Sequence, residues 1–155
     1  MIVQLRDESL TRSDCSGEIT GIIFFKLGSF QFPEQDWDDF IVTIMSWWLR
    51  ALIDLKTGVS KKEELLFMEG AFSVTLEKRN ASMCCLRFMK GDIRALKNID
   101  LYPLSDLADS FLTAAQQIYL ACLDRQWKSD DVDLLEKRID QLSELYPDLG
   151  TECQG

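Results

Sequence analysis

The sequence predicts an α+β fold in which an antiparallel sheet carries one central buried helix and two C-terminal helices packed on it. Apolar and polar residues alternate with a period of two in 71–89, which is typical of half-buried strands. In 104–125 and 129–146, apolar residues recur every three or four positions, as on one face of a helix. With 155 residues and 46% hydrophobic content, 1–155 is treated as a single domain with a sizeable core.

The N-terminal part of the chain is predicted to contribute strands. Ile2–Leu5 is a short apolar segment, and Ile19–Leu27 is a nearly continuous β-branched and aromatic run of the kind that is buried on both faces. A Gly-Ser pair then turns the chain into a short returning strand, Phe30–Phe32, which ends at Pro33.

The first helix is predicted to begin directly after Pro33 and to form the centre of the fold. Carboxylates suit the positive end of a helix dipole, and an acidic first turn is predicted at Glu34, Asp36, Asp38 and Asp39. Apolar residues then recur at steps of three and four, at Trp37, Phe40, Ile41, Ile44, Trp48, Leu52 and Leu55. Further apolar positions widen this stripe to about two thirds of the circumference, so the helix needs neighbours on more than one side. These positions are Val42, Met45, Trp47, Leu49 and Ile53.

A strand and turn are predicted at Leu65–Gly70, followed by a hairpin. Its strands are Ala71–Lys78 and Ser82–Met89, which both alternate between apolar and polar residues. Two helices complete the chain. One covers about Leu104 to Arg125, and the other begins after a Ser129 cap and ends before a proline.

The complete absence of histidine narrows the function classes. Without imidazole, the chain has no Ser-His-Asp triad, no Cys-His dyad and no histidine-ligated metal. It also lacks the glycine-rich phosphate loops and the hydrolase motifs that mark common enzymes. We therefore expect a protein that is not an enzyme and that uses no cofactor or metal.

Cysteine usage and the N-terminus predict a cytoplasmic location. The five cysteines form no C-x-x-C pair, and the adjacent Cys84 and Cys85 are expected to be small buried residues in a reducing compartment. Met1–Leu10 carries three charges and has no apolar signal-peptide core. The longest apolar stretch, Phe40–Leu55, contains two charges and is too short to cross a bilayer.

The charge of the chain is strongly acidic, with a net charge of −9. Residues 1–100 hold 13 basic and 15 acidic side chains, whereas 101–155 hold 4 and 11. Such an excess of carboxylates repels phosphate backbones and anionic membranes, so we expect neither nucleic acid nor a membrane as a partner. It attracts a basic macromolecule. Acidity that serves only solubility is the competing interpretation.

The predicted partner-binding side chains lie in the acidic last third of the chain. On or near the polar face of the last helix they are Asp130, Asp131, Asp133, Asp140 and Glu144. Trp127 joins them because exposed aromatic residues are enriched at interface hot spots, although packing in the corner between the two helices is an equal alternative. The Glu34–Asp39 group is the competing acidic surface.

Two segments form a combined pattern of short motifs. The first, FPEQDWDDFIVTIMSWWL (Phe32–Leu49), has the arrangement F-P…W-x-D-F…W-W. The second, LLFMEGAFSVTL (Leu65–Leu76), is close to F-M-D-G-P-Y-x-[IV]-x-[LV], with Glu69 replacing the Asp and Ala71-Phe72 replacing Pro-Tyr. Together they resemble small immunity proteins of bacterial polymorphic-toxin and contact-dependent growth-inhibition systems.

This resemblance implies an acidic cytosolic protein that binds and neutralises a cognate toxin domain, often a nuclease. A nuclease is basic where it grips phosphate, which suits an acidic inhibitor. The resemblance implies no particular contact residues, because immunity proteins diversify where they touch their toxins. The alternative is an acidic, non-catalytic adaptor or subunit of a cytosolic complex, and an enzyme that uses only Asp, Glu, Lys or Cys is a third possibility. The oligomeric state is left open.

Overall fold

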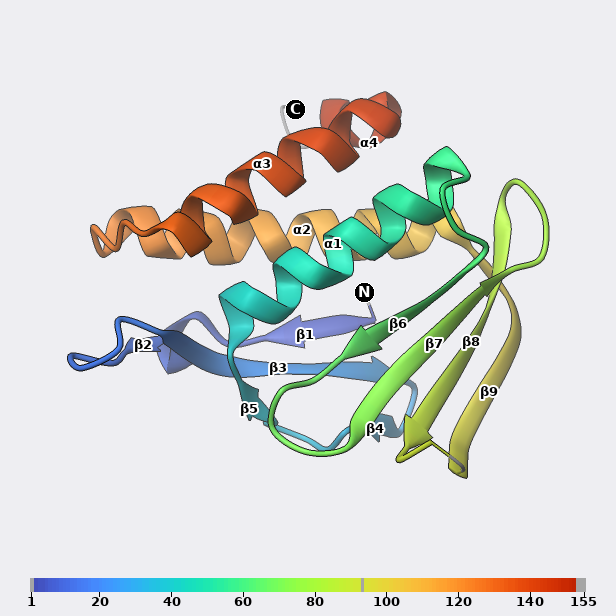
Figure 1. The fold of residues 1–155 in the computed structure, drawn as a ribbon, viewed down its shortest axis with the longest axis horizontal. Coiled ribbons are helices and arrows are strands. Elements are labelled where there is room, and N and C mark those ends of the chain that lie inside the picture. The colour runs from blue at the N-terminus through green and yellow to red at the C-terminus, as the bar shows by residue number, and fades with distance from the viewer. Residues whose placement is uncertain (1, 93, 153–155) are drawn as a thin grey trace.

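The computed structural model describes residues 2–92 and 94–152 and has two antiparallel sheets beneath a layer of helices (Figure 1). The helices are α1 (Ile41–Thr57), α2 (Leu104–Asp124), α3 (Asp130–Leu145) and α4 (Pro147–Glu152). α1 contacts both α2 and α3 and also both sheets. The predicted α+β class, with a buried central helix and two C-terminal helices packed on it, is confirmed. Within the described residues, no helix has the length and apolar character that crossing a bilayer requires.

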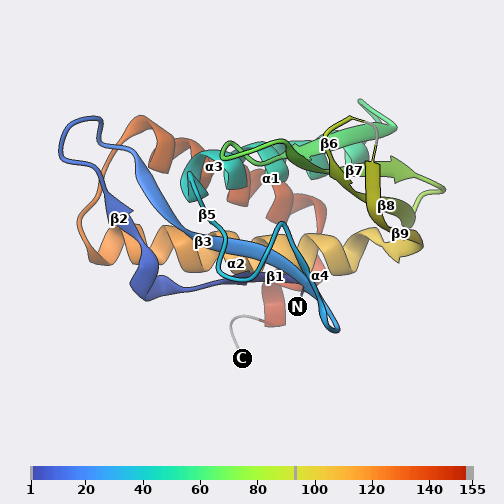
Figure 2. The same ribbon diagram turned by 90° about the horizontal axis from the view of Figure 1, so that it is seen from below.

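The first sheet is built on β3 (Ile19–Leu27), as the sequence predicts. Four shorter strands pair with β3 in antiparallel orientation, namely β1 (Val3–Leu5), β2 (Thr11–Arg12), β4 (Phe30–Phe32) and β5 (Asp38–Asp39). The short 3-10 helix η1 (Asp7–Ser9) separates β1 from β2. Figure 2 shows this sheet lying along α2, which β1 contacts.

The second sheet has the strand order β6–β7–β8–β9, whereas the sequence predicts only one sheet. Its strands are β6 (Lys62–Leu66), β7 (Phe72–Lys78), β8 (Met83–Lys90) and β9 (Arg94–Pro103). The predicted hairpin strands agree with β7 and β8 to within one residue. The strand predicted at Leu65–Gly70 starts earlier in the structure and leaves residues 67–71 as the turn. The sequence does not predict β9, because two register shifts against β8 break the alternation that identifies a strand.

An aromatic cluster joins α1 to both sheets. The side chains of Phe25 in β3, Trp48 in α1 and Phe88 in β8 are fully buried. The Phe25 ring centroid lies 5.2 Å from that of Trp48 and 5.7 Å from that of Phe88. These separations are typical of favourable aromatic contacts. The predicted coverage of α1 on several sides is therefore confirmed, except that Trp47 is exposed and Ile53 is only partly buried. Trp37 and Phe40 of the predicted stripe precede the helix.

The predicted start of the first helix is wrong. The helix begins at Ile41, and the acidic residues that were expected to form its first turn precede it. Asp36 has a left-handed backbone with φ 59°, which interrupts any helix there. Asp38 and Asp39 form β5 and pair with β3. Their carboxylates therefore do not lie in a helical turn.

The carboxylate of Asp39 has another role, because it joins two segments that are far apart in the sequence. Asp39 is only 1% exposed. It accepts hydrogen bonds from Trp37 Nε1 at 3.0 Å and from the Phe40 amide at 2.7 Å. Across the fold it accepts from the amides of Met68 and Glu69, at 3.2 and 3.1 Å. Four N–H groups thus replace the water that this buried charge loses, and they bind the entry of α1 to the β6–β7 turn.

We expect Asp39→Asn to lower the free energy of unfolding by about 2–4 kcal/mol. An amide offers one acceptor oxygen and brings donors of its own toward the four N–H groups that face it. Urea unfolding followed by tryptophan fluorescence measures the change. Asp38→Asn, at the exposed neighbour in β5, is the control and should change stability by less than about 0.5 kcal/mol. Equal losses in the two variants would contradict the role of Asp39.

Candidate functional site

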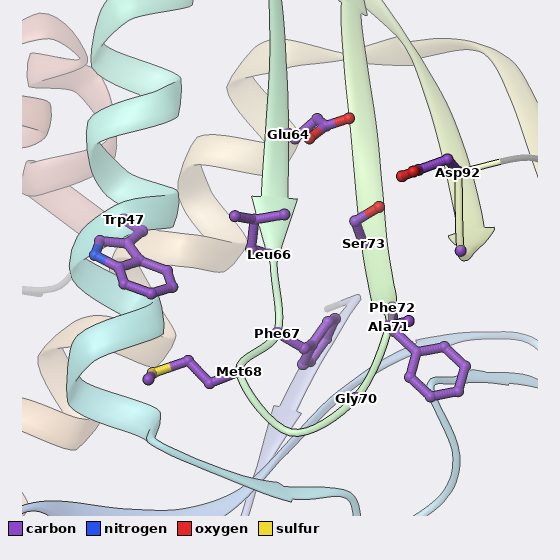
Figure 3. Close-up of a pocket in the computed structure, with 11 residues that line it drawn as sticks. Trp47, Glu64, Leu66, Phe67, Met68, Gly70, Ala71, Phe72, Ser73 and Asp92 are labelled. Carbon is purple, nitrogen blue, oxygen red and sulfur yellow. The ribbon is translucent and has the colours of Figure 1, made fainter.

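Three apolar side chains meet at the surface where α1 faces the end of β6. They are Trp47 from α1, Leu66 from the end of β6 and Met68 from the β6–β7 turn, as Figure 3 shows. Their exposed fractions are 43%, 43% and 44%, which is high for side chains of this size. We call them the apolar trio. A contiguous exposed group of this kind is typical of a protein interaction surface.

The apolar trio forms one end of a groove that continues over β7. The groove has a volume of about 320 Å³, which is at the small end of the range for binding sites, and it suits a side chain or a short peptide. Its opposite end is polar and is formed by Glu64, Ser73 and Asp92 (Figure 3). Glu64 and Asp92 are exposed, and they are the only charged residues among the described residues that line the groove.

The backbone beneath the apolar trio is held by buried hydrogen bonds. Trp48 Nε1 donates to the carbonyl oxygen of Leu66 at 2.9 Å, and the amide of Met68 donates to Asp39. Gly70 completes the turn with φ 112°, a conformation that side chains rarely adopt. A Cβ atom at Gly70 would also lie 3.4 Å from the Trp37 ring. The exposed side chains therefore stand on a fixed frame, which lowers the entropic cost of binding.

The predicted partner-binding carboxylates form a separate acidic surface on α3. Asp130, Asp131, Asp133, Asp140 and Glu144 are all exposed. Ser129 caps the helix as predicted, since its hydroxyl accepts from the Val132 amide at 3.2 Å. The acidic residues near the N-terminal end of α3 also suit the positive end of its dipole.

Tyr119 on α2 marks the place where several of these charges converge. Its hydroxyl donates a hydrogen bond to Glu136, a residue that the sequence analysis does not single out. This hydrogen bond, with partial burial and the negative charges of Glu136, Asp133 and Asp140, raises the pKa of Tyr119 to about 12. Glu136, Asp133 and Asp140 of α3 therefore lie close enough to α2 to act on the Tyr119 hydroxyl.

Trp127 lies in the corner between α2 and α3 and is half-buried against the core. Its amide donates to the Cys122 carbonyl at 2.9 Å, and the guanidinium of Arg125 lies 5.4 Å from its ring centroid. This position agrees with the corner-packing alternative and leaves part of the ring accessible. Its role in binding stays a prediction.

The competing acidic group at Glu34–Asp39 is less available to a partner. Asp39 is buried, and Asp36 forms an ion pair with Arg6 at 2.7 Å. Glu34 and Asp38 are exposed. Only part of the predicted group is therefore free to contact another protein.

The buried thiols of Cys84 and Cys122 are not reactive nucleophiles. Burial raises the pKa of the Cys84 and Cys122 thiols to about 11, so both are protonated at neutral pH and are weak nucleophiles. Among the described residues, no group of three or more Cys, Asp and Glu side chains has the geometry to hold a metal ion.

Comparison with protein-family models, with curated proteins and with solved structures finds no match to this chain. The resemblance of its two segments to immunity proteins therefore stays a prediction. The groove is the feature that the sequence analysis misses, because it assigns Trp47 to the apolar core stripe and Met68 to a hairpin turn. No local signal separates Trp47 from Trp48, because neighbouring residues on a helix point about 100° apart and an apolar arc of about two thirds of the circumference accommodates both.

We expect Glu136→Gln to bring the pKa of Tyr119 back toward its ordinary value near 10. A raised tyrosine pKa means that the stabilising contribution is complete below about pH 10 and is lost as pH rises toward 12. Absorbance titration at alkaline pH, with Tyr119→Phe to assign the transition, measures the shift. Asp130→Asn is the control and should leave this pKa unchanged, because Asp130 is not among the groups that raise it.

Proposed function

We propose that this protein is an immunity protein that binds and neutralises a cognate bacterial toxin domain in the cytoplasm. The observation that carries the proposal is the apolar trio, held on a hydrogen-bonded frame and bordered by carboxylates. Interface hot spots are typically aromatic or apolar side chains at the centre of a patch with a polar rim. A protein whose task is tight inhibition needs such a rigid surface.

The charge distribution supports a basic partner. The net charge is −9, and the exposed carboxylates of α3 add to those at the groove. An acidic surface accelerates the encounter with a basic protein. It also repels nucleic acid, the substrate that competes with an inhibitor for the basic surface of a nuclease. A basic nuclease domain is therefore the toxin class that fits best.

The two segments that resemble immunity proteins meet in this structure. Asp39 of the first segment accepts hydrogen bonds from Met68 and Glu69 of the second. Trp48 of the first donates to Leu66 of the second. The matching residues therefore build the frame of the groove and also supply two of its exposed side chains, Trp47 and Met68.

The direct test is binding to the product of the neighbouring gene. We expect a toxin domain to be encoded immediately upstream, to form a stable complex with this protein in calorimetry, and to lose its toxicity when the two are co-expressed. No binding at micromolar concentrations would contradict the proposal and would favour an acidic adaptor that serves a different complex.

We expect Trp47→Ala to weaken binding of the toxin domain about 30-fold or more, equivalent to roughly 2 kcal/mol. The indole is large and lies at the centre of the proposed contact, yet its partial exposure keeps it from supporting the core. Leu120→Ala removes another exposed apolar side chain, on α2, and should change affinity less than about twofold. Urea unfolding checks that both variants remain folded. Equal effects of the two substitutions on affinity would exclude the groove as the contact surface for the toxin domain.

We expect reversal of charge at Asp131 and Asp140 to slow association with the toxin domain by about three- to tenfold at low salt. Exposed charges act mainly on encounter, and their effect falls as the Debye length shortens to about 8 Å at physiological ionic strength. Stopped-flow mixing at two salt concentrations measures the association rate constant. Reversal at Lys61 and Lys62 is the control and should not slow association. A rate that is independent of salt and of these carboxylates would mean that the acidity serves solubility.

A further inference from the structure

We infer that the groove beside the apolar trio receives an arginine side chain of the partner protein. This inference rests on the proposed function and specifies the chemistry that the groove recognises. The groove is apolar at one end and acidic at the other. Both ends lie on the few residues where the end of β6 pairs with the start of β7. An arginine has the same order of groups, because a methylene stem leads to a planar cation.

The apolar end fits the methylene stem. Trp47 presents its indole beside Leu66 and Met68, and all three side chains are partly exposed (Figure 3).

The acidic end fits the donors of the guanidinium. Glu64 at the outer face of β6 and Asp92 after β8 are both exposed, and Ser73 lies between them on β7. Leu66 and Ser73 are register partners, as are Glu64 and Thr75, so the apolar and acidic ends are adjacent on the same face. Two carboxylates and a hydroxyl match the forked donors of arginine.

The cations on this face of the sheet, Lys62 two residues before Glu64 on β6 and Arg87 opposite Thr75 on β8, are not part of the groove lining. Among the described residues that line the groove there is no lysine or arginine. Arg50, one helical turn beyond Trp47, lies 3.6 Å from Asp54 and is not part of the lining. An anionic or purely apolar anchor would leave Glu64 and Asp92 facing a group that does not pair with them, which disfavours both.

The test is a titration of the nitrogen-15-labelled protein with N-acetyl-argininamide, followed through the indole N–H signal of Trp47. N-acetyl-norleucinamide is the neutral probe of similar length, and Trp47→Phe assigns the signal. We expect the arginine probe to shift the Trp47 signal in a saturable way and the neutral probe to shift it at least about fivefold less at equal concentration.

Two double variants with equal change in net charge locate the cation. Glu64→Gln with Asp92→Asn should raise the dissociation constant of the arginine probe about fivefold or more, whereas Glu136→Gln with Asp140→Asn should leave it within about twofold. Equal shifts from both probes, equal losses in both double variants, or no shift of the Trp47 signal would overturn the inference. None of these outcomes affects the toxin-binding test of Trp47→Ala, so a failure of the inference is distinguishable from a failure of the proposed function.

Discussion

The buried carboxylate of Asp39 is the constraint on which the arrangement of the helices and the second sheet depends. It faces N–H groups from the strand that precedes α1 and from the β6–β7 turn, so one side chain sets the distance between these segments. A buried charge is costly unless donors surround it, and here the donors come from both segments. The charge is therefore stable only when α1 and the second sheet are correctly docked, which favours one arrangement over alternatives.

The tryptophan pair of α1 links this docking to the exposed apolar trio. Trp48 enters the core and donates to Leu66, while Trp47 emerges on the outside over the same end of β6. The residue that stabilises the contact and the residue that is available to a partner are thus adjacent in the chain. Because the frame is already fixed by the fold, a partner loses little free energy in ordering it.

The sequence predicts the periodic elements well and the irregular ones poorly. Ile19–Leu27, α2 and α3 depend on local pattern and lie as predicted, whereas α4, which begins at the proline predicted to end the last helix, is not predicted. The start of α1 depends on Asp39 meeting a turn about thirty residues away, which no local pattern reveals. Carboxylates at Asp131 and Asp140 are correctly predicted to be exposed, since charge alone favours the surface. The groove requires knowing which of two neighbouring tryptophans faces the core, and this is decided by tertiary packing.

The groove and the acidic face of α3 need not compete for the same role. Electrostatic attraction acts over roughly 8 Å at physiological ionic strength, so under the proposed function the carboxylates of α3 would act on the approach of a basic toxin domain without touching it. Apolar contact acts only where atoms meet, which is the property of the surface at Trp47 and Met68. Charge on α3 would then govern how often the partners meet, and the groove would govern how long they stay together.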